Sequence, residues 1–194
     1  MKIKGVFAIL LVFVLIGCAE ENYVPKPLGY ARIDFPEHEY QKLNSESCPF
    51  DFEYSQHAQI IPVKAKNGQK CWFNIKYPNQ KATIHFSYLD VESKKLNDVI
   101  EDSRRLAMEH LRKADDYEES VVFDSASKVY GVIYDFRGST ASNYQFYLTD
   151  SASHFVRGAL YFEVTPKADS LYPAEQYIET DVFHMIQSFT WKED

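Results

Sequence analysis

The middle of the chain is dominated by segments in which apolar and polar residues alternate. Residues 50–54, 71–77 and 82–88 all follow this pattern, and Pro78 and Asn79 separate the last two. Because successive side chains of a strand point to opposite faces, each segment presents one apolar face for burial. The alternation therefore predicts three half-buried strands, of which the last two form a hairpin around the Pro-Asn turn.

Two other segments repeat their apolar residues every three or four positions, which is the period of an α-helix. Asn97 is the predicted N-cap of the first, and its acidic start and basic end suit the helix dipole. Its apolar stripe is Leu96, Val99, Ile100, Ser103, Ala107, Leu111 and Ala114. The stripe of the second helix is Ile178, Val182, Met185, Ile186 and Phe189. We expect this second helix to lie on the sheet.

Four more strands are expected between these two helices. They fall near residues 121–123, 129–137, 143–149 and 155–164. Their short polar connections predict an antiparallel meander. Strands, a central helix, strands and a closing helix together predict a single α+β domain over residues 30–194, an antiparallel sheet covered by helices. The order of elements from Trp72 onward resembles the Mog1/PsbP-type fold.

The first 18 residues have the layout of an export signal. Lys2 and Lys4 precede an apolar run, Gly5–Ile16. This run is shorter than the roughly 20 residues of a membrane-spanning helix. Leu15-Ile16-Gly17-Cys18 resembles the lipobox of bacterial lipoproteins, in which the cysteine is acylated and the bond before it is cut. We expect a removable signal peptide over residues 1–17 and a lipid-bearing Cys18. The alternative is an ordinary signal peptide with a chance cysteine.

Residues 18–29 contain two prolines and several charges without apolar periodicity, which predicts a lipidated tether. A semi-extended chain of this length reaches about 30 Å, at roughly 3.1 Å per residue. The acidic pair Glu20 and Glu21 has two interpretations that the sequence leaves open. It resembles the surface-export signals of Bacteroidota lipoproteins, and it is equally compatible with ordinary linker charge.

Alternation begins again at Tyr30 and predicts a strand that Pro36 ends. Tyr30, Arg32 and Asp34 would then share one face of that strand. They could form a docking stripe for an envelope partner or a polar ladder towards a neighbouring strand, and the sequence does not decide between the two.

Charge and cysteine content restrict the function further. The formal net charge is −7, and removal of the leader with its two lysines makes it −9, which argues against nucleic acid as a partner. Membrane attachment should therefore run through the acyl chains alone. Cys48 and Cys71 are the cysteines that remain once Cys18 carries lipid. An exported chain meets an oxidising compartment, so we expect the two to form a disulfide, which would contribute about 3 kcal/mol. The alternative is two buried thiols.

Catalytic motifs are missing from the sequence. It has no Gly-x-Ser-x-Gly, phosphate loop, Cys-x-x-Cys or His-Glu-x-x-His, and its six histidines include no helical pair at i, i+4. The acidic residues at 115–119 are predicted to be a solvated connection, and residues 138–142 a hairpin loop. We expect no enzyme, cofactor or metal, since an enzyme would need a buried titratable pair that the sequence does not reveal.

Residues 25–36, Tyr40 and the segment Trp72-Phe73-Asn74-Ile75-Lys76-Tyr77-Pro78 resemble the gliding motility lipoprotein GldD family of the Bacteroidota, and the likeness covers essentially the whole chain. With the lipobox, we expect a palmitate-type lipid anchor at Cys18 in the outer membrane, and the sequence leaves open whether the protein faces the periplasm or the cell surface. The resemblance implies a non-enzymatic role in gliding motility and the linked type IX secretion system, with other gliding or secretion lipoproteins and envelope proteins as partners. No functional residue beyond Cys18 carries over. The alternative is a lipid-anchored binding module for a small ligand or glycan.

Overall fold

The computed structural model describes residues 34–64, 70–91, 95–164 and 168–192. The expected signal peptide, Cys18 and the tether lie outside these residues. Among the helices that are described, none combines the length and the apolar character that a membrane span requires.

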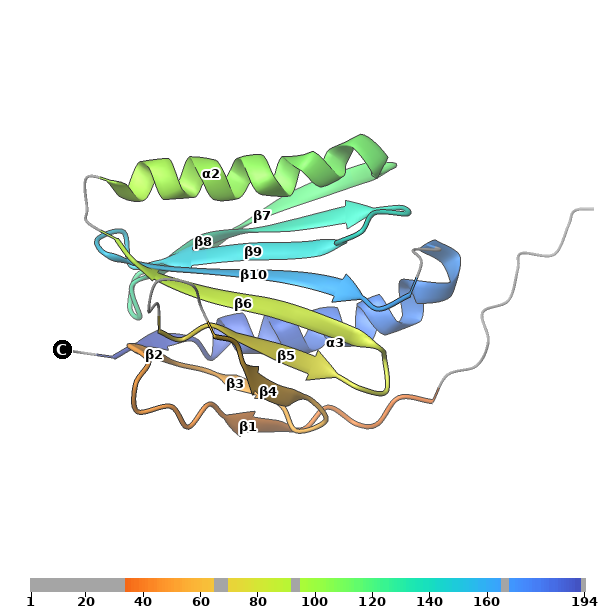
Figure 1. Cartoon of the computed structure of the whole chain (residues 1–194), viewed down its shortest axis with the longest axis horizontal. Coiled ribbons are helices and arrows are strands. Elements are labelled where there is room, and N and C mark those ends of the chain that lie inside the picture. The colour runs from red at the N-terminus through yellow and green to blue at the C-terminus, as the bar shows by residue number, and fades with distance from the viewer. Residues whose placement is uncertain (1–33, 65–69, 92–94, 165–167, 193–194) are drawn as a thin grey trace, which may run out of the picture.

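A seven-stranded antiparallel sheet forms the middle layer of the domain (Figure 1). Its strands, in order across the sheet, are β4 (Gln59–Pro62), β5 (Phe73–Tyr77), β6 (Ala82–Asp90), β10 (His154–Phe162), β9 (Tyr144–Thr149), β8 (Val129–Arg137) and β7 (Asp116–Asp124). The predicted hairpin is confirmed, since Tyr77 pairs with Ala82 across the turn. The predicted meander is confirmed too, because β7, β8, β9 and β10 pair in chain order.

Helices cover both faces of this sheet (Figure 1). On one face, α2 (Leu96–Met108) continues into a 3₁₀ helix, η3 (Glu109–Lys113), and α3 (Ala168–Gln187) lies on the other. Two small sheets complete the domain. They pair β1 (Tyr40–Lys42) with β3 (Glu53–Ser55), and β2 (Phe50–Asp51) with β11 (Thr190–Trp191). This arrangement is the predicted α+β architecture.

The main core lies between the sheet and α3. All five residues of the predicted stripe are buried, and the last of them, Phe189, lies just beyond the end of the helix. Phe50 is fully buried and packs its ring 5.5 Å from those of both Phe86 and Phe189. Because a buried aromatic side chain contributes about 1.5–3 kcal/mol, this cluster holds much of the fold's stabilising free energy.

The face under α2 has a much smaller core. α2 buries only three side chains, those of Leu96, Ser103 and Ala107. The predicted stripe ends early: the backbone tightens to a 3₁₀ helix at Glu109, the helical period is lost, and Leu111 is left 38% exposed. The predicted N-cap is wrong as well. The capping position is Lys95, whose side chain cannot accept a hydrogen bond from the first helical N–H groups.

The N-terminal strand that the alternation predicted is not found in its described part. Asp34 and Phe35 lie outside any strand, and the first described strand is β1. Phe35 stacks instead on Tyr177 of α3, with ring centroids 4.8 Å apart. Packing of the Phe35 ring against α3, and not backbone pairing with a neighbouring strand, is therefore the contact described for this segment.

Two further expectations are corrected. Residues 50–54 form two short strands, because β2 pairs with β11 while β3 pairs with β1. The acidic residues at 116–119 belong to β7, which pairs with β8 from Asp116 to Asp124. Their side chains are exposed on both faces of the strand. Without alternating burial, this half of β7 has no strand pattern in its sequence, and it was therefore predicted as a solvated connection.

Candidate functional site

Residues 34–42, which we call the arm, lie across α3 and bring aromatic rings and histidines together. The His38 ring stacks on Tyr177 with centroids 4.4 Å apart, and Tyr40 stacks on His184 with centroids 3.5 Å apart. The predicted tether leads directly into the arm. These stacked rings therefore hold the arm against the closing helix.

A buried carboxylate anchors the arm. The His38 Nδ1–H donates to Asp181 Oδ1 at 2.6 Å, and Asp181 is only 2% exposed. Burial, followed by the charge of Asp181, raises the pKa of Tyr40 to about 12 and the pKa of Tyr77 well above its usual value. A buried carboxylate is costly unless it is paired, and the contact with His38, together with hydrogen bonds from Tyr40 and Tyr77, offsets the cost of burying Asp181.

A second histidine–carboxylate pair lies beside the first. His184 Nε2 is 2.8 Å from Glu53 Oε2, which joins α3 to β3. Both side chains are about one-third exposed, so this pair is weaker than that of His38 and Asp181. Together the two pairs connect the arm, α3 and β3.

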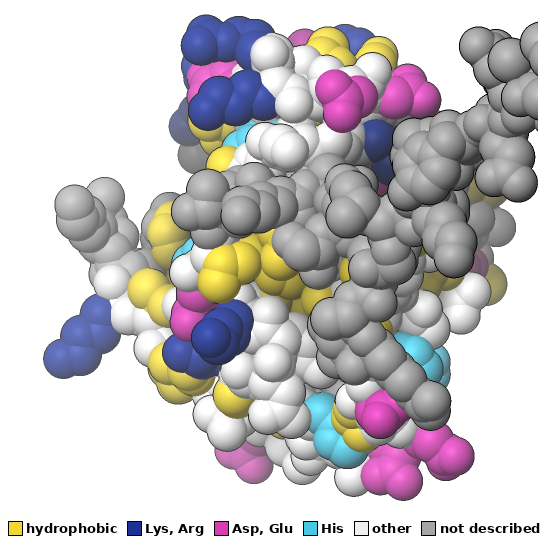
Figure 2. Space-filling model, turned by 90° about the vertical axis from the view of Figure 1, so that its right-hand side faces the viewer, with side chains coloured by type: hydrophobic (Ala, Val, Ile, Leu, Met, Phe, Trp, Pro, Cys, Tyr) yellow, Lys and Arg dark blue, Asp and Glu magenta, His cyan; other side chains and the backbone are white. Residues whose placement is uncertain are grey.

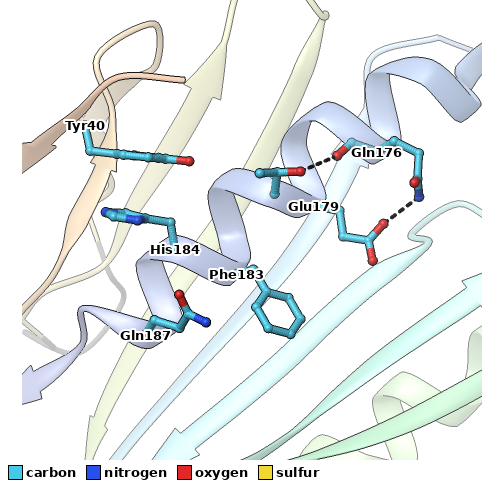
Figure 3. Close-up of a pocket in the computed structure, with 7 residues that line it drawn as sticks. Tyr40, Gln176, Glu179, Phe183, His184 and Gln187 are labelled. Atoms are coloured by element: carbon cyan, nitrogen blue, oxygen red, sulfur yellow. Dashed lines mark hydrogen bonds between the residues drawn. The ribbon is translucent and has the colours of Figure 1, made fainter. Parts of the chain in front are cut away.

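Beside the arm, the outer side of α3 forms a hollow of about 460 Å³ (Figure 3). Its lining residues are Tyr40, Gln176, Glu179, Thr180, Phe183, His184 and Gln187. Figure 3 shows the Tyr40 and His184 rings lying parallel at one side, with Phe183 projecting from the helix. Gln176 donates to Glu179 at 2.6 Å, and the Phe183 side chain is 47% exposed. An exposed ring among hydrogen-bonding side chains is typical of a surface that contacts another protein.

Charged groups are distributed unevenly at this end of the molecule. Figure 2 shows histidine and acidic side chains at the bottom of the view, on the side of the arm, and Lys and Arg side chains together with acidic ones at the top, where the α2–η3 segment ends. η3 carries Arg112 and Lys113 in its last turn. A partner that approaches the arm therefore meets mainly acidic and imidazole groups.

The structure also places a titratable group that the sequence did not indicate. Burial, followed by the negative charge of Asp135, raises the pKa of Glu175 to about 7. Arg137 lies 2.5 Å from Asp135 and partly offsets this charge. Glu175 thus belongs to a pair of shifted carboxylates under α3. Glu175 lies outside the apolar stripe of α3, so the sequence did not indicate that its carboxyl group is partly buried.

The residues predicted from sequence separate into three groups. Cys18, Tyr30 and Arg32 lie outside the described residues, so the lipid site and most of the docking stripe stay predictions. Asp34 is exposed at the start of the arm. Cys48 and Cys71 are joined by a disulfide with their Cα atoms 5.6 Å apart.

The arm contacts were missed because their partners are far apart in sequence. His38 and Asp181 are separated by 143 residues, and no short motif relates them. One signal was available: Asp181 lies inside the apolar stripe of α3, between Ile178 and Val182, where an acid must be paired. Across the described part of the chain, no group of His, Cys, Asp and Glu is arranged to hold a metal ion.

Comparison with known proteins gives one family match and one informative structural likeness. A family model described as gliding motility lipoprotein GldD matches residues 20–191. Comparison with curated proteins gave no match. The solution structure of cyanobacterial PsbP (CyanoP) from Synechocystis is similar, with a TM-score of 0.51 and 12% identity over 85% of this chain and 99% of that one. At this identity the likeness concerns the fold alone, and it confirms the predicted PsbP-like architecture.

Proposed function

The chain belongs to the gliding motility lipoprotein GldD family, and from this membership we propose that it is a lipid-anchored, non-enzymatic component of the cell envelope. In this role it supports gliding motility and the linked type IX protein secretion machinery. It does so by contacting other lipoproteins or envelope proteins, with the outer membrane as its site of attachment through Cys18.

The observation that supports this proposal most is the fixed arm. Only 15 residues lie between Cys18 and Asp34, and an extended chain of that length spans at most about 55 Å. The arm is then held to α3 by His38 and Asp181. A lipid at Cys18 would therefore keep the α3 surface close to the membrane, where envelope partners are found.

The shape of the α3 surface favours a protein partner over a small ligand. A module for a small molecule or glycan needs a concave, largely apolar pocket with a few convergent polar groups. The hollow beside Tyr40 is open to solvent and is lined mostly by polar side chains. Such a surface suits a broad contact with another protein.

Cross-linking and affinity purification of the intact lipoprotein from envelopes test the proposal. We expect the wild-type chain to recover gliding or secretion components. The Cys18→Ala variant should leave the membrane fraction and lose these partners, because its acyl anchor is gone. Recovery of no such component by the wild-type chain, or membrane sedimentation of Cys18→Ala at the wild-type level, would contradict the proposal.

A further inference from the structure

β7 is a long edge strand of the main sheet. It contains nine residues, pairs with β8 on one side, and has no strand on its other side among the residues that the structure describes. The opposite edge strand, β4, has four residues and ends in Pro62. Short length and proline are common protections of a sheet edge, because both limit pairing with a further strand. β7 has neither protection.

The register shows which backbone groups of β7 face the free edge. Phe136 N donates to Asn143 O at 2.7 Å, so the even-numbered residues of β8 hydrogen-bond with β9. The odd-numbered residues of β8 then bond with the even-numbered residues of β7. It follows that the N–H and C=O groups of four β7 residues point outward: Tyr117, Glu119, Val121 and Phe123. The Tyr117 N–H already donates to Asp116 Oδ1 at 2.8 Å, so the N–H groups left for a further strand are those of Glu119, Val121 and Phe123.

The side chains of the same four residues lie on the α2 side of the sheet. Val121 is 78% exposed and Phe123 is 75% exposed, the two largest exposures among the large apolar side chains described. Tyr117 is 41% exposed. An edge strand with free backbone groups and exposed apolar side chains is a template for strand addition.

The acidic residues of β7 indicate which kind of strand can pair with its free edge. β7 carries Asp116, Glu118, Glu119 and Asp124, and the whole chain has a net charge of −7. If a second copy paired antiparallel about Ser120, Asp116 would lie opposite Asp124 of that copy, and like charges directly opposite each other destabilise a pair of strands. A strand with lysine or arginine opposite these acids avoids that cost.

We propose that β7 binds, by strand addition, a basic segment of a partner protein that alternates Lys or Arg with apolar residues. The apolar residues of this segment pack against Val121 and Phe123, and its basic residues face the acids of β7. The inference specifies the partner class of the proposed function, and it rests on that function for the existence of an envelope partner.

Photo-cross-linking of the full lipoprotein in envelopes tests this proposal. The probe is benzoylphenylalanine, placed at position 121 or 123 and, as a control, at position 183 on α3. We expect positions 121 and 123 to label one and the same partner segment, rich in Lys or Arg, and position 183 to leave that segment unlabelled. The double variant Glu118→Lys, Glu119→Lys should reduce this labelling about tenfold.

A proline variant separates strand addition from a general surface effect. Val121→Pro removes an outward N–H and leaves the hydrogen bonds between β7 and β8 in place, so thermal unfolding should stay near that of the wild type while labelling from position 123 falls about tenfold. The matched variant Val121→Ala keeps the N–H and should retain most of the labelling.

Other labelling results would overturn the inference. These are adducts with a second copy of the chain, adducts with lipid alone, no adduct at 121 or 123, and labelling that the charge reversal leaves unchanged. If the wild-type purification still recovers gliding or secretion components in such a case, the proposed function stands and the docking surface lies elsewhere. If it recovers none, the proposed function itself fails.

Discussion

The two faces of the main sheet are covered to very different extents. On one face, α3, the arm and β2 pack a large aromatic core in which Phe50, Phe52 and Phe189 are buried. On the other face, α2 buries three side chains and leaves β7 with exposed Val121 and Phe123. The difference teaches that most of the stabilising burial lies on one side of the sheet, while the other side leaves a strand edge exposed. The α3 side holds the fold, and the α2 side leaves an edge free for contact.

The largest expected effect falls on the aromatic core. Phe50→Ala should lower the free energy of unfolding by about 3–5 kcal/mol, because it removes a fully buried ring and leaves a cavity. Val121→Ala should change the free energy by no more than about 0.5 kcal/mol, since its side chain is exposed. Urea denaturation of both variants checks this contrast. Equal losses would show that the two faces do not differ as described.

The disulfide should have the next largest effect. The bond closes a loop with a sequence separation of 23 residues, and its removal by Cys48→Ser with Cys71→Ser should cost about 3 kcal/mol. Thermal unfolding with and without reductant measures the same contribution in the unmodified chain. An unchanged melting temperature under full reduction would refute the expectation, and mass spectrometry after export would show whether the thiols pair in the cell.

Loss of the arm contact should be smaller. His38→Ala removes the hydrogen bond from the imidazole to the buried Asp181, to which Tyr40 and Tyr77 also hydrogen-bond, and should cost about 2 kcal/mol. His184→Ala provides the matched control, and its cost should be at most about 1 kcal/mol, because Glu53 remains partly solvated. Hydrogen exchange of the backbone amides at residues 38–42 should rise in the first variant and much less in the second. The reverse order would contradict the role assigned to Asp181.

The smallest effect concerns pH. The folded-state pKa of Glu175 is raised from 4.5 to about 7, so the folded state binds this proton more tightly than the unfolded state. The stabilising contribution is complete below pH 4.5 and is lost as the pH rises to about 7, a change of about 1 kcal/mol after allowance for solvent screening. Glu175→Gln should flatten this part of the pH–stability curve. A curve that keeps its slope in Glu175→Gln would assign the effect to another group.

The same contrast explains what the sequence could predict. Strands with one buried face, such as β5 and β6, were predictable because alternation records burial directly. The stripe of α3 was predictable for the same reason. The acidic half of β7 was not, since both of its faces meet solvent and no burial pattern exists there.

The candidate site was less predictable than the fold. The sequence left open a docking stripe or a polar ladder at Tyr30, Arg32 and Asp34, and it gave no indication that Phe35 and His38 pack on α3. Pairing between His38 and Asp181 depends on how the arm crosses the helix, and that crossing has no local sequence signal. The PsbP-like order of elements could be recognised because it needs only the sequence of strands and helices.

The central claim is that the α3 side stabilises the domain while the β7 edge binds the partner. Gliding and type IX secretion in a strain whose only copy carries Val121→Pro test it most directly, with wild-type and Val121→Ala copies as references. We expect the proline variant to fold, to reach the membrane at the normal level, and to lose most gliding and secretion. Wild-type gliding and secretion in that strain would contradict the claim.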